Sequence, residues 1–394
     1  MAGPSLVGIV NPDLLKWARE ACSLNVEAAA KKLGVKPEKI AAWEAGDAAP
    51  TMKQLRDLGD VYRRAVSFFF LDKRPKTAKK PIDFRKLELS SIDQFSYDLS
   101  VGIREAQAKR ESALDIYAEL EVEPPKFDLS IAADTPADTA AVQLAKYLGV
   151  TFEQRAQWSD EYEALRAWRT AAEARGVLIM QVSRVSIDEM RGCSLALFPL
   201  PIVLLNSTDR PLGRIFTLLH ELAHLARRES ALCDVFEERH RERSAQDIEV
   251  YCNQVAGSTL VPAANLLKRA DVAGATARTE WSADQLGTMR KAFWASREVV
   301  LRQLLHHGKT TKAHYQRMRE VFVADYQRMR KKQTKVIVPQ SRRVVMKNGR
   351  FLTDLVVDAY DAQVITGSTL SRILGTKLNH LTKIKEILRG KEAA

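Results

Sequence analysis

The chain has 394 residues, of which 46% are hydrophobic, 28% charged and 7% aromatic, a composition typical of globular proteins. At roughly 100–200 residues per domain, this length predicts two to four domains. A membrane-spanning helix needs about twenty apolar residues, whereas the longest apolar runs reach about eleven, so the sequence excludes a transmembrane protein.

The N-terminal residues and the cysteines indicate where the protein works. The first residues lack the basic region, apolar core and small-residue cleavage site of a signal peptide. The four cysteines, Cys22, Cys193, Cys233 and Cys252, show neither paired metal spacing nor the density of a disulfide framework. We therefore expect a cytoplasmic protein without a membrane partner.

The formal net charge of +12 is concentrated at one end of the chain. Residues 291–394 carry 22 Lys and Arg against 8 Asp and Glu, a net of +14, while the first 290 residues carry the other 39 basic and 41 acidic side chains, a net of −2. Clustering of basic residues is what indicates nucleic-acid binding. Any such binding is therefore expected first in the C-terminal region.

Residues 1–75 predict a compact unit of four or five short helices. Asn25 is placed to cap a helix that Gly34 ends, and Pro37 suits the first turn of the next helix. This succession is typical of a helix-turn-helix. The basic, Pro-containing stretch that follows indicates a linker, which we place at residues 76–90.

Residues 91–290 predict a second, mostly helical domain with a small sheet. Three runs rich in Val, Ile and Leu have the length of strands, at 176–182, 193–198 and 202–206. Helical patterns surround them, at 92–121, 136–148, 152–175, 212–228 and 247–259.

The C-terminal region, residues 291–394, predicts helices up to about residue 329. The runs 336–345 and 351–360 then predict a strand followed by a strand or a helix. The expected fold class is therefore α+β and mostly helical, with a basic α/β region at the C-terminal end.

The residues that carry chemistry are His220-Glu221-Leu222-Ala223-His224. Positions four apart share one face of a helix, so both imidazoles can bind one Zn²⁺ while Glu221 points toward water at the open position of the metal. This is the zincin arrangement. Packing that would hold the histidines is supplied by apolar residues of the same helix, Leu218, Leu222 and Leu225.

A catalytic zinc needs a third protein ligand, and Glu249 is the best candidate. It lies in a helical run whose apolar side can pack against the metal helix. The competing acids occupy a charged connection that we expect to face solvent: Glu229, Asp234, Glu237, Glu238 and Glu242. The alternative for the whole motif is a buried His/Glu helix that binds no metal.

Four segments, in order and in spacing, resemble the ImmA/IrrE family of metallopeptidases over residues 176–265. They are Arg191-Gly-Cys-Ser-Leu195, Pro201-Ile-Val-Leu-Leu-Asn206, Phe216-Thr-Leu-Leu-His-Glu-Leu-Ala-His224, and Glu249 followed by Asn253, Ala256, Leu260 and Pro262. Cys252 stands where family members usually have Ala.

The resemblance implies a zincin-like metallopeptidase domain. It implies zinc ligands at His220, His224 and Glu249 and a catalytic base at Glu221, with Mn²⁺ as an alternative metal. It also implies that the protein cuts helix-turn-helix repressors at a specific site, which releases genes for stress responses, defence or mobile elements.

The N-terminal unit resembles the XRE-type helix-turn-helix in the segments Ala28 to Leu33, Gly34-Val35 and Trp43-Glu44-Ala45-Gly46. Its recognition helix offers Lys36, Glu38 and Lys39 as readers of DNA or of a partner repressor. Residues 1–72 hold 10 basic and 9 acidic side chains, and such a surface binds DNA weakly unless it is dimerised. Reading DNA would therefore predict a homodimer.

Cys193 lies shortly before the metal helix. One interpretation is an inhibitory thiolate that occupies the open position of the zinc; the other is a small buried apolar residue.

The basic C-terminal region predicts a sensor or a nucleic-acid-binding surface. It offers Arg328, Arg330, Lys331 and Lys332 as nucleic-acid contacts, with Tyr315 and Tyr326 interleaved for base stacking. The alternative is a solvated helical face.

Together these features predict a cytoplasmic zinc endopeptidase that cleaves a partner helix-turn-helix repressor. The second hypothesis is a transcription regulator or antitoxin-like component with a non-catalytic zincin fold.

Overall fold

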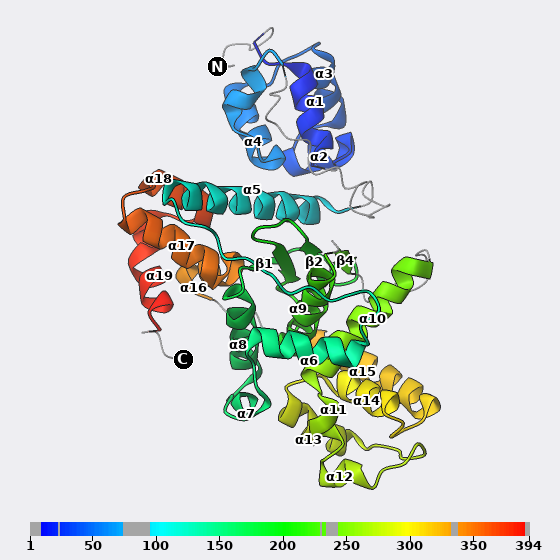
Figure 1. Ribbon diagram of the computed structural model, residues 1–394. Coiled ribbons are helices and arrows are strands. Elements are labelled where there is room, and N and C mark those ends of the chain that lie inside the picture. Colours follow the sequence, from blue (N-terminus) through cyan, green and yellow to red (C-terminus); the bar gives the residue numbers. More distant parts are fainter. Residues whose placement is uncertain are drawn as a thin grey trace. The chain divides into compact units, whose positions relative to one another are not determined.

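The computed structural model describes residues 9–22, 24–73, 95–228, 231–233, 243–331 and 338–390. Contacts between Cα atoms divide the chain into two compact units, Met1–Glu105 and Ala106–Ala394. Figure 1 shows the elements of each unit in the order of the chain. Among the described residues, no helix has the length and apolar character needed to cross a membrane.

The first unit is a bundle of short helices. They are α1 (Pro12–Glu20), α2 (Val26–Leu33), α3 (Pro37–Ala45), α4 (Met52–Tyr62) and the 3-10 helix η1 (Val66–Phe70). The predicted signals are confirmed: the Asn25 side chain accepts a hydrogen bond from the backbone N–H of Ala28, Gly34 ends α2 in the left-handed conformation, and Pro37 is the first residue of α3. The predicted linker, residues 76–90, lies outside the described residues.

Helices α5 (Tyr97–Glu119), α6 (Ala137–Leu148), α7 (Phe152–Arg155) and α8 (Glu161–Glu173) precede the sheet. The single helix predicted over 152–175 is two helices, because Asp160 starts a new one. Its carboxylate accepts hydrogen bonds from the backbone N–H groups of Tyr162, at 2.7 Å, and Glu163, at 2.8 Å.

The sheet has four strands in the order β1-β3-β2-β4. The three predicted strands are confirmed as β1 (Leu178–Val182), β2 (Gly192–Leu195) and β3 (Ile202–Asn206). β1 runs parallel to β3, whereas β2 is antiparallel to both of its neighbours. β4 (Ala231–Cys233) was not predicted, since three residues are too few to show an alternating pattern.

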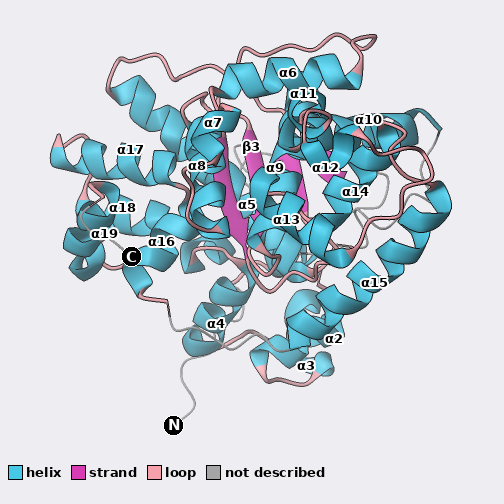
Figure 2. Cartoon of the chain, turned by 90° about the horizontal axis from the view of Figure 1, so that it is seen from below, coloured by secondary structure: helices cyan, strands magenta, loops and turns pink. Residues whose placement is uncertain are grey.

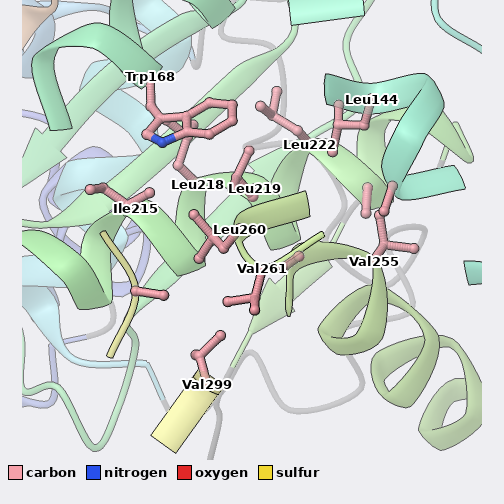
Figure 3. Close-up of a cluster of buried hydrophobic side chains, with 14 of the residues drawn as sticks. Leu144, Trp168, Ile215, Leu218, Leu219, Leu222, Val255, Leu260, Val261 and Val299 are labelled. Carbon is pink, nitrogen blue, oxygen red and sulfur yellow. The ribbon is translucent and has the colours of Figure 1, made fainter. Parts of the chain in front are cut away.

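Helices α9 (Pro211–Ala226) and α10 (Arg243–Leu260) pack against each other, and α9 also packs against β2. Figure 3 shows how their apolar side chains meet: Leu218 and Leu222 of α9 lie near Leu260 of α10 and Trp168 of α8. Figure 2 shows the strands surrounded by helices. The core of the second unit is therefore built around α9.

The remaining helices of the second unit follow α10. They are α11 (Ala263–Leu266), α12 (Ala270–Ala273), α13 (Ala283–Phe293), α14 (Arg297–His306), α15 (Lys312–Lys331), α16 (Gln340–Asn348), α17 (Arg350–Asp361), α18 (Gly367–Leu374), η4 (Leu378–His380) and α19 (Leu381–Leu388).

The fold class, mostly helical with a small sheet, is confirmed, but the α/β expectation for the C-terminal region is wrong. The part of residues 336–345 that the structure describes belongs largely to α16, and 351–360 lies in α17. The β-branched Val residues suggested strands, but Leu352, Val356 and Val357 are buried at helical spacing. Burial of this face outweighs the local preference for strand.

Candidate metal centre

Helix α9 buries the three motif residues in the core of the second unit. His220 is 3% exposed, His224 2% and Glu221 0%. His220 and His224 are one helical turn apart, so their rings lie together, with centroids 4.8 Å apart. Glu249 comes from α10, which packs against α9, and its side chain is 15% exposed.

Three nitrogen and oxygen donors converge at nearly equal spacing. The Nε2 atoms of His220 and His224 are 3.1 Å apart. The Glu249 carboxylate reaches both, with Oε2 at 3.3 Å from His220 Nε2 and Oε1 at 3.5 Å from His224 Nε2. Among the described residues, these three form the group of His, Cys, Asp and Glu side chains that is compact enough to hold a metal ion.

This spacing fits a divalent metal. Ligands about 2.0–2.1 Å from an ion at tetrahedral angles lie about 3.3 Å from one another. Without a cation, the lone pairs of the two Nε2 atoms, 3.1 Å apart, would repel each other unless one ring carries its proton on Nε2 and donates it to the other. Two imidazoles and one carboxylate are also a common donor set for catalytic zinc, and they leave one position open.

Strand β2 lies directly against the catalytic candidate Glu221. A Cβ atom on Gly192 would lie 3.2 Å from Glu221 Oε1 and 2.3 Å from Cγ2 of Thr217. Only glycine therefore allows β2 to approach α9 so closely. Sequence reasoning did not assign Gly192 a role, although a glycine inside a short strand is the signal that could have found it.

A buried carboxylate fixes the start of α9. Asp209 Oδ1 accepts hydrogen bonds from the backbone N–H of Arg210, at 2.8 Å, and from the hydroxyl of Tyr326, at 2.9 Å. Its Oδ2 accepts from Nη1 of Arg191 at 3.1 Å. Arg191 directly precedes Gly192, so one carboxylate ties together the beginnings of β2 and α9 and the distant helix α15. Sequence reasoning missed Asp209 as well.

Comparison with family models finds a match within each unit. Residues 172–305 match the IrrE N-terminal-like domain, a peptidase family, and residues 15–69 match the helix-turn-helix family. The chain therefore carries an IrrE N-terminal-like peptidase domain and a helix-turn-helix domain. No curated protein matches the chain. The matches confirm the expected ImmA/IrrE architecture and indicate a metallopeptidase with a metal cofactor, a protein substrate and a DNA-binding domain.

Cys193 of the peptidase domain lies in β2 and is 1% exposed. Burial, with a smaller contribution from Glu221, raises the pKa of its thiol well above the ordinary value, which disfavours the thiolate. The group of metal-binding side chains among the described residues does not include Cys193. An inhibitory thiolate stays a prediction that this environment does not favour.

In the helix-turn-helix domain, Lys36, Glu38 and Lys39 are exposed around the start of α3. Lys39 Nζ lies 5.6 Å from the centroid of the Trp43 ring. These side chains are therefore accessible to a partner, but their mixed charge offers no strong field for phosphates.

In the basic C-terminal region, Arg328 is exposed and lies 3.7 Å from Asp325. Lys332 and the side chains of Arg330 and Lys331 lie outside the described residues. The hydroxyl of Tyr326 binds Asp209, and that of Tyr315 binds Arg302 and Glu298. Both tyrosines are thus engaged within the domain, which weakens their interpretation as base-stacking residues.

Proposed function

We propose that the protein is a zinc-dependent endopeptidase, with Mn²⁺ as an alternative metal, that cuts a helix-turn-helix repressor in the cytoplasm. Cleavage would relieve repression of a stress-response, defence or mobile-element operon. One observation carries the proposal: the side chains of His220, His224 and Glu249 bring nitrogen and oxygen donors within 3.1–3.5 Å of one another, and Glu221, the residue after His220, is fully buried.

His220, His224 and Glu249 would hold the metal. When bound, zinc polarises a peptide carbonyl and makes water more acidic. Glu221 accepts the proton of the attacking water and then delivers it to the leaving amine. Gly192 lets β2 lie against Glu221.

The helix-turn-helix match supports a second candidate, in which the chain is a transcription regulator with a non-catalytic zincin fold. In that case α3 would read DNA and the protein would act as a homodimer. Glu221 separates the two candidates, because a purely structural site has no use for a proton acceptor there.

The test is cleavage of the repressor encoded beside the gene, using purified protein with zinc or manganese. Glu221→Gln should lower the rate by about 10²–10⁴-fold, the usual contribution of a general acid–base group, while the variant keeps its bound metal. Glu123→Gln is the matched control, since this carboxylate is 83% exposed. Cleavage that survives Glu221→Gln would refute the acid–base role of Glu221, whereas a wild-type protein that binds the operator and cuts nothing favours the regulator.

A further inference from the structure

The second unit buries two arginines with almost no compensating charge. Arg214 of α9 is 4% exposed, and the side chain of Arg169 of α8 is 12% exposed. The guanidinium of Arg214 makes one hydrogen bond among the described residues, to Gln181 Oε1 at 3.3 Å, and its Nε has no partner there. Four of its five donor N–H groups are therefore left without a protein acceptor in the described part of the chain.

Arg169 is held as weakly. Its Nη2 reaches the carbonyl oxygens of Ile179, at 3.3 Å, and Met346, at 3.4 Å, while its Nε has no partner among the described residues. The nearest carboxylate is Glu173, at 3.9 Å. Burial raises the pKa of Glu173 to about 7. Near neutral pH the Glu173 carboxyl group is therefore only partly ionised and balances only part of the charge of Arg169.

Both guanidiniums converge on the same stretch of β1. Arg169 contacts Ile179 and Arg214 contacts Gln181, two residues further along, a separation of about 7 Å along a strand. Burial and, to a smaller extent, the neighbouring Arg169 lower the pKa of Arg214. The other nearby carboxylate, Asp209, already binds Arg191.

Two other buried arginines make shorter hydrogen bonds to main-chain carbonyls, although Nε of Arg155 also has no partner among the described residues. Arg110 donates to the carbonyl oxygens of Pro199 at 2.7 Å and Leu200 at 2.9 Å, and Arg155 to those of Leu260 at 2.9 Å and Thr259 at 3.1 Å. The short contacts of those residues contrast with the long ones of Arg169 and Arg214. A buried charge without such partners is strongly destabilising.

We propose that Arg169, Arg214 and Gln181 form a binding site for a phosphoryl oxyanion between α8, α9 and β1. A phosphate carries up to two negative charges and several acceptor oxygens, which match the free N–H groups of two guanidiniums. Arg214 lies six residues before His220 on the same helix, so the ligand binds on the helix that carries the metal-binding histidines.

The experiment measures phosphate binding to the full-length purified protein by calorimetry and by thermal unfolding in a chloride buffer of constant ionic strength. Inorganic phosphate should raise the melting temperature of wild type and release a saturable heat. Arg214→Met should lower phosphate affinity at least tenfold and abolish the rise. In phosphate-free buffer this variant should melt at or above the wild-type temperature, because a buried unpaired charge is removed.

Arg166→Met is the matched control, since Arg166 is an exposed residue of α8 and the change in net charge is the same. A nucleoside monophosphate assayed in parallel identifies the source: tighter binding than inorganic phosphate indicates a nucleotide, and equal or weaker binding indicates free phosphate. A wild type that does not respond overturns the proposal. So does a response that Arg214→Met retains, or an Arg214→Met variant that is equally destabilised with and without phosphate. None of these readouts depends on cleavage, so failure here leaves the proposed peptidase function untouched.

Discussion

Helix α9 carries two buried polar clusters of opposite character less than two turns apart. At His220 and His224, lone pairs converge with the Glu249 carboxylate at the spacing of ligands around one cation. At Arg214, N–H donors converge with those of Arg169, and the described residues supply few acceptors. The contrast shows that one core helix can carry two polar clusters of opposite sign, one that suits a cation and one that suits an anion.

The largest effect is expected from removing one of the three candidate metal ligands, His220, His224 and Glu249. His224→Ala removes one of three donors, so the metal content should fall from about one per chain to a small fraction, measured by elemental analysis. At a free metal concentration of about 100 times the dissociation constant, metal binding stabilises the fold by about 2.7 kcal/mol. A chelator should therefore lower the melting temperature of wild type and hardly change that of His224→Ala. Equal shifts would show that the metal binds elsewhere.

The Glu173 carboxylate, which lies near Arg169, should make the free energy of unfolding depend on pH. Burial raises the pKa of Glu173 to about 7 from an ordinary value of 4.5, so this group stabilises the fold at low pH. That contribution is lost as the pH rises from about 4.5 through about 7 and amounts to roughly 3 kcal/mol at most. Urea unfolding at a series of pH values should show a smaller loss of stability for Glu173→Gln over this window. Parallel profiles would mean that the Glu173 carboxylate titrates normally.

Substitution of Gly192 tests whether the contact between β2 and Glu221 keeps the candidate metal site in its active geometry. Gly192→Ala places a methyl group 2.3 Å from Cγ2 of Thr217, and overpacking of this kind costs about 1–3 kcal/mol. Repressor cleavage should fall, with metal content unchanged, because the displaced strand shifts Glu221. Adding Thr217→Ser removes Cγ2 and should restore part of both stability and activity. A double variant no better than Gly192→Ala would place the clash elsewhere.

The smallest effect is expected at the start of α9, which lies near both clusters. Tyr326→Phe deletes one hydrogen bond to Asp209 and should lower the free energy of unfolding by about 1 kcal/mol. Tyr315→Phe is the control, because that hydroxyl binds Arg302 and Glu298 instead. If Tyr326→Phe reduces cleavage and Tyr315→Phe does not, then the packing of α15 influences α9 through the hydrogen bond between Tyr326 and Asp209.

Features encoded in neighbouring residues could be predicted from the sequence. His220, Glu221 and His224 share one turn of helix, and Glu249 lies on an amphipathic run, so local periodicity brought them to attention. Asn25 and Gly34 mark helix ends through their own backbone chemistry. The strands β1 to β3 were visible as short apolar runs.

What the sequence did not reveal depends on contacts between distant segments. Arg169 and Arg214 are 45 positions apart and both reach residues of β1, because α8 packs against β1 and against α9. Gly192 has a role only once β2 lies on α9. The valines of α16 and α17 favour strand locally, and burial of one helical face in the C-terminal region decided otherwise.

The burial of α9 has a consequence for how the domain tolerates mutation. Fourteen of its sixteen residues are buried, so the helix that carries the motif is also the centre of the core. Selection for folding alone would favour an apolar side chain in place of Glu221, since an ionisable group in such a site lowers stability. The Glu221 carboxylate therefore lowers stability, and a role in a reaction would explain why it is present. A lineage that lost the reaction should lose this carboxylate before it loses the leucines around it.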